Sequence, residues 1–304
     1  MLCMLAMTGL YVRIKSLRSF YMKYLIGISW FILSLLISSV NDIIGKYVSA
    51  NISPLETAFF RFLFGTLSLI PFIFYNGLES IKTSRPLLHF IRGLFLTIAI
   101  FLWIKGLSTS QVTTATIISF TIPIFILILA PIFLGEKVSM KLWIVTIIGL
   151  VGIMIILNPS RLSFNINSLL FVVATILFAS LDIINKKYTI KESMLSMLFY
   201  SSLVTAILGG LAIFISTATW QTPKIRDLIY LMLLGFGSNA ILYCLLKAFR
   251  LVKASSVAPF RYLELLISLG LGYAVFHDLP NYTAYIGASL IIPCSLYITL
   301  QRKL

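Results

Sequence analysis

Two short stretches, NDIIGKYV at residues 41–48 and LDIINKKY at residues 181–188, indicate how this chain is built. Each lies at the end of a long apolar run, and each places an aspartate four residues before a lysine. The two pairs are Asp42 with Lys46 and Asp182 with Lys186, and they lie 140 positions apart. Ionisable residues are rare in such apolar segments. The repetition therefore indicates that the chain contains two copies of one unit.

The composition around these stretches is that of a membrane protein. Of the 304 residues, 60% are hydrophobic and 11% are charged, and the mean hydropathy is +1.03. A soluble domain has roughly 25% charged residues, so this chain lacks the polar side chains that would cover a core in water. Apolar runs of roughly 20 residues cross a hydrocarbon layer of about 30 Å as helices. We predict ten such runs, near residues 24–41, 54–75, 88–107, 111–134, 141–157, 166–184, 193–216, 226–247, 252–276 and 281–300.

The net charge of +15 follows from membrane topology and does not indicate a nucleic-acid partner. With the N-terminus placed in the cytoplasm, 17 lysines and arginines fall at cytoplasmic helix ends and 5 at the opposite ends. Arg61 and Arg261 lie inside predicted helices. Cytoplasmic loops of membrane proteins carry an excess of Lys and Arg. The distribution therefore predicts that both termini are cytoplasmic, in a multi-pass protein of a bacterial inner membrane.

The two copies align beyond the opening stretches. Gly93 matches Gly235, Lys105 matches Lys247 and Glu136 matches Asp278 at a spacing of 142, and Gly149 matches Gly287 at 138. Each copy then contains five helices. Because five is odd, the second copy starts from the opposite side of the membrane. The predicted fold is an all-α membrane protein with ten transmembrane helices arranged as two inverted five-helix repeats, the architecture of alternating-access transporters.

The repeat divides the chain into four segments. Residues 1–23 are expected to form a cytoplasmic N-terminal tail, with Met22 as an alternative start to Met1. Residues 24–157 form the first five-helix repeat, residues 158–165 the linker, and residues 166–304 the second repeat.

Four motifs carry a resemblance to a known family. They are RFLFG at 61–65, HFIRGLF at 89–95, SFTIPIF…FLGEKVS at 119–139 and VAPFRYLELL…VFHDLP at 257–280. With the ten predicted helices, they resemble the EamA-type branch of the drug/metabolite transporter superfamily over residues 24–300. The chain departs from the branch at His277-Asp278, where Gly-Glu is more usual, so that Asp278 keeps the acid with a shorter reach.

The resemblance implies secondary active transport of a small metabolite. Within the branch, the sequence is most similar to bacterial S-adenosylmethionine uptake transporters, which implies uptake of that solute, with exchange for S-adenosylhomocysteine as one mode. The alternative is an exporter of amino acids or amphiphilic metabolites on the same fold. The expected partners are this solute and the lipid bilayer; the oligomeric state is left open.

A more distant alternative, a membrane-embedded enzyme, finds little support. The two histidines, His89 and His277, are predicted near opposite membrane faces, and the three cysteines do not have the spacing of a metal site. A phosphate-binding loop of the G-x-x-x-x-G-K-[ST] type and a Gly-x-Ser-x-Gly nucleophile motif are both missing from the sequence. We therefore expect no catalysis, no cofactor and no metal.

The pairs Asp42–Lys46 and Asp182–Lys186 are candidates for gating or coupling. Residues four apart lie on one helix face and can form an ion pair, and a lysine near a helix end can extend to the interface. The pairs could anchor the helix ends or could take part in gating at opposite faces. Both readings remain open.

Glu264 is the first candidate for substrate binding. It lies in the ninth run, about twelve residues from either end, where a charge costs roughly 2.5–3.5 kcal/mol. Arg261 lies one turn earlier and could pair with it, which is the alternative to a ligand role. Tyr262 and Phe260 could offer an aromatic platform, and Pro259 loosens the helix because it has no backbone N–H.

Arg61 in the second run is the candidate partner for a substrate carboxylate, since its guanidinium can bind one in bidentate fashion. It could equally pair with Glu56 or extend to an interface. Asn239 and Tyr243 are candidate cavity residues for hydrogen bonding and stacking. Arg92 is interpreted as a charge that sets topology near the cytoplasmic end of the third run.

Overall fold

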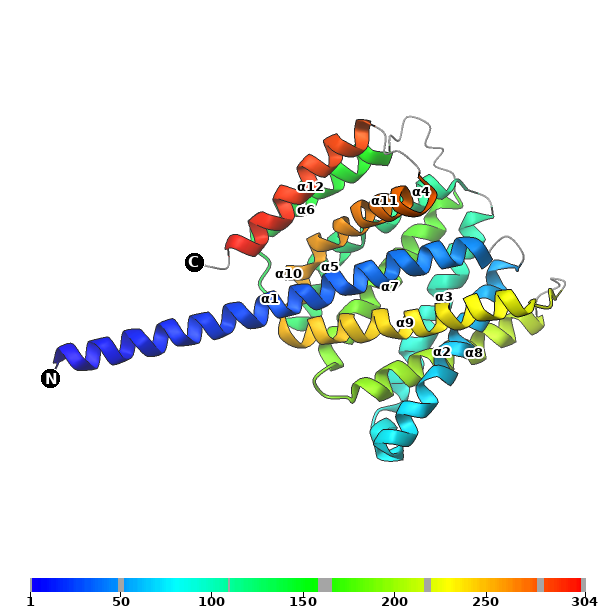
Figure 1. Ribbon diagram of the computed structural model, residues 1–304, viewed down its shortest axis with the longest axis horizontal. Coiled ribbons are helices and arrows are strands. Elements are labelled where there is room, and N and C mark those ends of the chain that lie inside the picture. The colour runs from blue at the N-terminus through cyan, green and yellow to red at the C-terminus, as the bar shows by residue number, and fades with distance from the viewer. Residues whose placement is uncertain are drawn as a thin grey trace.

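The structure is a computed structural model that describes residues 2–48, 52–108, 110–157, 166–215, 220–277 and 282–301. Over these residues the chain is helical, with no strand (Figure 1). The elements are α1 (Leu2–Val48), α2 (Pro54–Asn76), η1 (Leu78–Ile81), α3 (Pro86–Leu107), α4 (Val112–Ser119), α5 (Ile122–Leu134), α6 (Met140–Leu157), α7 (Ser168–Tyr188), α8 (Met194–Ile215), α9 (Ile225–Leu251), α10 (Ala254–Val257), η3 (Ala258–Tyr262), α11 (Leu263–Phe276) and α12 (Tyr282–Gln301).

The ten predicted apolar runs correspond to helical segments of the structure. Among the described residues, nine helical segments are long and apolar enough to cross a membrane. The run at 252–276 is not one helix, as its length suggested, but is broken into α10, η3 and α11. Pro259 lies in η3, where its missing N–H favours the break. The run at 111–134 is also interrupted, between α4 and α5, just before Pro123.

The two broken segments occupy equivalent places in the two repeats. Phe120 directly follows α4 and Tyr262 ends η3, and these residues are 142 positions apart, the spacing that aligns the repeats. Their rings lie 6.3 Å apart between centroids. Two equivalent residues that contact each other lie at the axis relating the two copies. The breaks therefore meet at the centre of the pseudo-two-fold arrangement.

The packing of the helices follows this symmetry. Helix α1 packs along α9, and its counterpart α7 packs along α3, the counterpart of α9. Helices α2 and α8 are counterparts that pack on each other, as are α6 and α12, which lie together at one side of the bundle (Figure 1). The main helix pairs thus each join one repeat to the other. This confirms the predicted fold of two five-helix repeats and makes each repeat depend on its partner for burial.

The closest approach of α2 to α9 lies beside Arg61. A Cβ atom built on Gly235 would meet the backbone N of Gly65 at 2.6 Å and the backbone O of Arg61 at 2.8 Å. Any larger residue at this position of α9 would push the two helices apart. Glycine therefore fixes the backbone of Arg61 against the middle of α9, where Ser238 and Asn239 follow.

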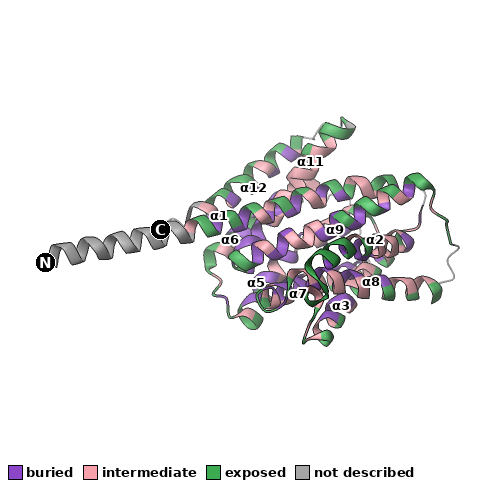
Figure 2. Cartoon of the chain, turned by 60° about the horizontal axis from the view of Figure 1, so that its bottom comes forward, coloured by how far each residue is buried: buried purple, intermediate pink, exposed green. Residues whose placement is uncertain are grey.

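Large apolar side chains cover the outside of the bundle. Buried residues face its interior, and exposed residues lie on its periphery (Figure 2). The exposed residues include Phe74, Tyr75, Phe214 and Ile215. An apolar surface of this extent is stable against lipid and not against water.

Candidate functional site

Five charged side chains from both repeats converge inside the bundle. Asp42 of α1 interacts electrostatically with Arg61 of α2 and with Glu264 of α11. Asp182 of α7, the equivalent of Asp42, interacts with Arg261 of η3 and also with Glu264. Glu264 thus lies within range of both aspartates. The structure brings together candidate residues that the sequence placed on separate helices, and the three carboxylates outnumber the two guanidiniums.

Glu264 is a carboxylate without a direct partner among the described residues. It lies in the first turn of α11, which continues directly from η3. Its side chain is half-buried, and no described residue donates a hydrogen bond to it or forms an ion pair with it. The expectation that Glu264 lies mid-helix is wrong, because the helix starts only one residue before it. A carboxylate left open in this way is available to a cationic ligand.

Arg261 does not pair with Glu264. Its Nη2 atom lies 2.6 Å from Oδ2 of Asp182 and donates a hydrogen bond to it. The alternative of an Arg261–Glu264 pair is therefore wrong. The physical reason is tertiary packing, because α7 brings the carboxylate of Asp182 within bonding distance of the Arg261 guanidinium.

Arg61 is half-buried on α2 and is held by α9. Its Nε donates a hydrogen bond to Oγ of Ser238, which itself donates to the backbone oxygen of Leu234 at 2.6 Å. The suggested pair with Glu56 is not formed, because Glu56 accepts bonds from Ser53 and from the backbone N of Gln221 instead. The terminal nitrogens of Arg61 have no hydrogen-bond partner among the described residues. They remain available for an anionic group.

The other candidates on α9 differ from each other. Asn239 is buried, and its amide donates to the backbone oxygen of Gly65 at 2.6 Å and to Ser68 at 3.2 Å, while its oxygen accepts from Ser202 at 3.0 Å. Its hydrogen-bonding capacity is used by the protein. Tyr243 is half-buried, and its ring stands edge-on to Trp30 with 6.0 Å between centroids.

Phe260 and Tyr262 lie in the apolar core. Phe260 is 2% exposed and belongs to the cluster that contains Tyr24 and Phe31. Tyr262 is 1% exposed and packs with Phe120 and other apolar side chains between the repeats. The structure does not bring these two rings to an open surface beside the charges. Among the aromatic candidates, the Trp30–Tyr243 pair retains exposed area.

The end of the bundle that contains Asp182 is closed by contacts to the C-terminal end of α9 and to α10. Lys186 donates hydrogen bonds to the backbone oxygens of Phe249 and Val252 at the C-terminus of α9. A lysine there complements the negative end of the helix dipole. The predicted Asp182–Lys186 pair is therefore wrong: each residue has a different partner across the bundle.

Glu136 closes the same end from α5. Its carboxylate accepts hydrogen bonds from the backbone N of Ala254 and of Ser255, both at 3.0 Å, and from the hydroxyl of Ser255 at 2.5 Å. It thus caps the N-terminus of α10, after Gly135 has ended α5 in the left-handed conformation. The acid of the LGE motif ties the two broken segments together. The equivalent acid, Asp278, lies outside the described residues.

The equivalent end, at Asp42, is not closed in the same way. Asp42 is exposed and makes no ion pair or hydrogen bond with any described residue, whereas Asp182 is buried. The position equivalent to Arg261 is Ser119, at the spacing of 142. Segments η3 and α10 pack on α5, but α4 makes no equally extensive contact with α11 in the described ranges. The two equivalent ends are thus in different arrangements, and Lys46, near the Asp42 end, is exposed.

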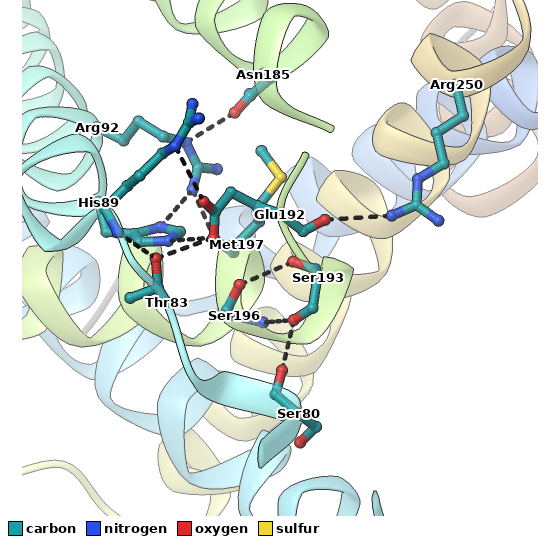
Figure 3. A network of polar contacts seen from close by, with 11 residues as sticks. Ser80, Thr83, His89, Arg92, Asn185, Glu192, Ser193, Ser196, Met197 and Arg250 are labelled. Atoms are coloured by element: carbon teal, nitrogen blue, oxygen red, sulfur yellow. Dashed lines mark hydrogen bonds and ion pairs between the residues drawn. The ribbon is translucent and has the colours of Figure 1, made fainter. Parts of the chain in front are cut away.

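A second charged cluster, not foreseen from the sequence, joins α3, α7 and α8 (Figure 3). Arg92 is 1% exposed; its Nε donates to Oδ1 of Asn185 at 3.0 Å, and its Nη1 to the backbone oxygen of Met197 at 3.1 Å. Nε2 of His89 lies 3.5 Å from the carboxylate of Glu192, which also accepts from Thr83 at 2.9 Å. Arg92 is thus a buried structural group as well as a charge near a helix end.

The repeat gives this cluster an apolar counterpart. His89 and Arg92 correspond to Leu231 and Leu234 at a spacing of 142, and Glu192 corresponds to Ile52 at 140. These three apolar residues pack together with Val48 in one core cluster. One end of the bundle thus uses charges at a seam where the other end uses aliphatic side chains. The spacing of His89 and Arg92, three residues apart on one helix, was the available sequence signal.

The central site presents charged groups that can bind a solute. Among the described residues, no group of three or more His, Cys, Asp or Glu side chains could hold a metal ion. Open carboxylates at Glu264 and Asp42, beside the open guanidinium of Arg61, can bind a solute that carries both signs of charge.

Comparison with known proteins supports this view of the chain. The model of the EamA-like transporter family matches twice, at residues 25–158 and 165–300. The S-adenosylmethionine uptake transporter of Rickettsia bellii is 48% identical over 92% of this chain and 95% of its own length, and that of Rickettsia prowazekii is 45% identical over 92% and 94%. The riboflavin transporter of Rhizobium johnstonii is 28% identical over 91% of each chain.

The fold has also been seen in a solved structure. A crystal structure of a protein aligns with a TM-score of 0.79 over 92% of this chain and 97% of its own, at 17% identity, which supports the fold alone. The double family match and the two Rickettsia relatives cover nearly all of the chain. This multi-pass membrane protein belongs to the EamA-like transporter family.

Proposed function

We propose that this protein takes up S-adenosylmethionine across a bacterial inner membrane. The solute is the one named for the Rickettsia relatives, which are similar to this chain over most of its length. It carries a sulfonium, an ammonium and a carboxylate, so a binding site must present both signs of charge. The central site offers acids from three helices and one open guanidinium.

One observation carries the proposal: Glu264 is a half-buried carboxylate inside a membrane bundle without a direct partner in the described structure. An acid in this environment is retained for a functional reason. A sulfonium or an ammonium would supply the missing charge. The neighbouring Asp42 adds a second open carboxylate, which favours a cationic solute over a neutral one such as a simple apolar amino acid.

The asymmetry between the two ends supports alternating access. The Asp182 end is held by an ion pair, by Lys186 and by the Glu136 cap, while the Asp42 end lacks these contacts. On the proposed topology, with both termini cytoplasmic, the closed end is cytoplasmic and the site faces outward. Because the two repeats are equivalent, an exchange of their arrangements would open the site to the cytoplasm.

Uptake of labelled S-adenosylmethionine into bacterial cells expressing the chain tests the proposal. We expect saturable uptake that S-adenosylhomocysteine inhibits and free amino acids do not. Glu264→Gln should abolish uptake at normal membrane levels, whereas Glu79→Gln, at a side chain 82% exposed on the surface, should not change it. Uptake no greater than in vector controls would reject the substrate.

Two further assays distinguish solute exchange and amino-acid export from simple uptake. If the transporter exchanges solutes, preloading with unlabelled S-adenosylhomocysteine should accelerate uptake. If it exports amino acids instead, cells that express it should release labelled amino acids faster and show no uptake of S-adenosylmethionine.

A further inference from the structure

We infer that Arg61, positioned by Ser238, binds the carboxylate of the transported solute and so selects α-amino acids that carry an additional positive charge. This inference rests on the proposed function and assigns a specificity-determining subsite within the same site. Three observations lead to it: the unpaired terminal nitrogens of Arg61, the hydrogen bond that holds its Nε, and the charges that are coupled to it.

The first observation is that most hydrogen-bond donors of the Arg61 guanidinium have no acceptor among the described residues. Of its five N–H groups, Nε alone has a hydrogen-bond acceptor among the described residues, the hydroxyl of Ser238. Asp42 is near enough to interact electrostatically but makes no direct bond. A guanidinium in a membrane bundle needs a compensating negative charge or hydrogen-bond acceptor. The repeat does not require an arginine here, because Ser201 stands at the equivalent position of the second repeat.

The second observation is that the guanidinium is held in a fixed plane. Ser238 accepts a hydrogen bond from Nε and donates one to the backbone oxygen of Leu234, so its hydroxyl is oriented by α9. The close contact of Gly65 with Gly235 fixes the separation of the two helices one turn away. A guanidinium fixed through Nε keeps its two terminal nitrogens in the geometry that binds a carboxylate with two parallel hydrogen bonds.

The third observation is the electrostatic coupling among the charges. Asp42 interacts with both Arg61 and Glu264, but Arg61 interacts with Asp42 alone. Asp42 is therefore the acid that is coupled to both the guanidinium and Glu264. A solute whose carboxylate binds Arg61 would place its adjacent ammonium at Asp42 and a further cation toward Glu264. That sequence of groups describes an α-amino acid with a second positive charge on its side chain, as in the proposed substrate.

The alternative is that Arg61 only offsets the charge of Asp42. The two readings differ in one measurable quantity, the preference for a solute over its decarboxylated analogue. If Arg61 binds the carboxylate, the protein prefers the carboxylated solute. If Arg61 only balances the charge of Asp42, its loss affects the binding of both solutes equally.

The experiment measures inhibition of labelled uptake, or displacement from purified protein, by S-adenosylmethionine and by its decarboxylated analogue. The wild type should prefer the carboxylated form by about ten- to a hundredfold, the value of a charge-assisted hydrogen-bonded pair. Arg61→Gln should lose this preference while still binding the decarboxylated analogue. Ser238→Ala should reduce it severalfold. Ser202→Ala, which removes a hydroxyl bonded to Asn239 and not to Arg61, should retain it.

Equal weakening of both solutes in Arg61→Gln would overturn the subsite. If that variant fails to reach the membrane, Ser238→Ala decides alone, and an unchanged preference there would likewise overturn it. Failure of the proposed substrate is distinguishable, because arginine and agmatine form a second pair that differs only by the carboxylate. Thermal stabilisation of the purified wild type by arginine in preference to agmatine would support the subsite even without uptake of S-adenosylmethionine. No preference in either pair would reject it.

Discussion

Asp182 and Arg261 form an ion pair, with 2.6 Å between Oδ2 and Nη2, that has no counterpart in the other repeat. The equivalent aspartate, Asp42, is exposed, and the residue equivalent to Arg261 is Ser119. The pair joins α7 to the broken segment η3 at the closed end of the bundle. Because this end has a charge pair that the other end lacks, we expect the two end states of the transport cycle to differ in free energy.

The first prediction concerns the removal of this pair. Arg261→Gln should destabilise the closed arrangement at the Asp182 end, since removal of one partner of a buried pair costs up to several kcal/mol. Ala258 is buried in η3 and is a suitable reporter. In a background without native cysteines, Ala258→Cys should react with an impermeant maleimide slowly in the wild type and about tenfold faster with Arg261→Gln.

The control for this experiment is Arg226→Gln, which removes an exposed arginine in the first turn of α9 that stacks on Tyr230. It should leave the labelling rate unchanged. Equal labelling rates with and without Arg261 would show that the ion pair does not hold this end closed.

The second prediction moves the pair to the opposite end. Ser119→Arg combined with Arg261→Ser should let position 119 pair with Asp42 when that end closes, because the repeat relates the two sites. The protein should then favour the state in which the Asp42 end is closed over the state in which the Asp182 end is closed. Thr116, the equivalent of Ala258, reports on the other end when it is changed to Cys.

In the doubly changed protein, labelling at position 116 should fall while labelling at position 258 rises. Adding Asp42→Asn should restore labelling at 116, because the new arginine then has no acid to bind. Protection at 116 that persists with Asp42→Asn would mean that the arginine acts by bulk and not by charge.

The sequence predicted the fold from local signals. Apolar runs of membrane length and the repetition of Asp42–Lys46 at Asp182–Lys186 suffice for ten segments in two related halves, because both signals lie within single helices. The residue types of Asp42, Arg61 and Glu264 marked them as candidates, because ionisable residues in membrane helices are rare and functional, but their convergence could not be read from the sequence.

The pairing of the charges could not be predicted in the same way. Arg261 and Glu264 are three residues apart, which suggests contact along one helix, but Arg261 binds Asp182 of α7 instead. Glu192 lies a hundred residues from its partner His89, so only the packing of α8 against α3 brings them together. Side-chain partners across helices depend on tertiary packing, which periodicity does not encode.

The third prediction concerns the cap on α10. Glu136→Ala removes the acceptor of two backbone N–H groups and one hydroxyl, all buried. Loss of a helix cap costs about 0.5–2 kcal/mol, and buried unsatisfied donors add to this. Thermal unfolding in detergent should occur several degrees lower. Glu79→Ala, at an exposed acid that pairs with Lys82, should leave the midpoint within error. An unchanged midpoint in Glu136→Ala would contradict the capping role.

The fourth prediction uses the apolar counterpart of the buried cluster. Glu192→Ile leaves His89 and Arg92 without their acid and should destabilise the protein by about 3–5 kcal/mol, since an uncompensated buried charge remains. Replacing all three residues, with His89→Leu and Arg92→Leu added, reproduces the apolar residues of the equivalent seam. Apolar replacement of a whole buried ionic cluster is often neutral or stabilising. The triple variant should therefore unfold at a higher temperature than the single one.

The comparison of the single and triple variants also tests the symmetry of the fold. If the helix contacts at Arg92 and at Leu234 are structurally equivalent, the aliphatic residues of the second contact should fit the first. Asn185 and the backbone oxygen of Met197 would then have to find other hydrogen-bond donors. Thermal unfolding of both variants measures stability, and uptake measures whether the cluster is needed for the cycle. A triple variant less stable than Glu192→Ile would show that the two seams are not equivalent in packing. A stable triple variant without uptake would assign the charges a role in transport that the aliphatic seam does not share.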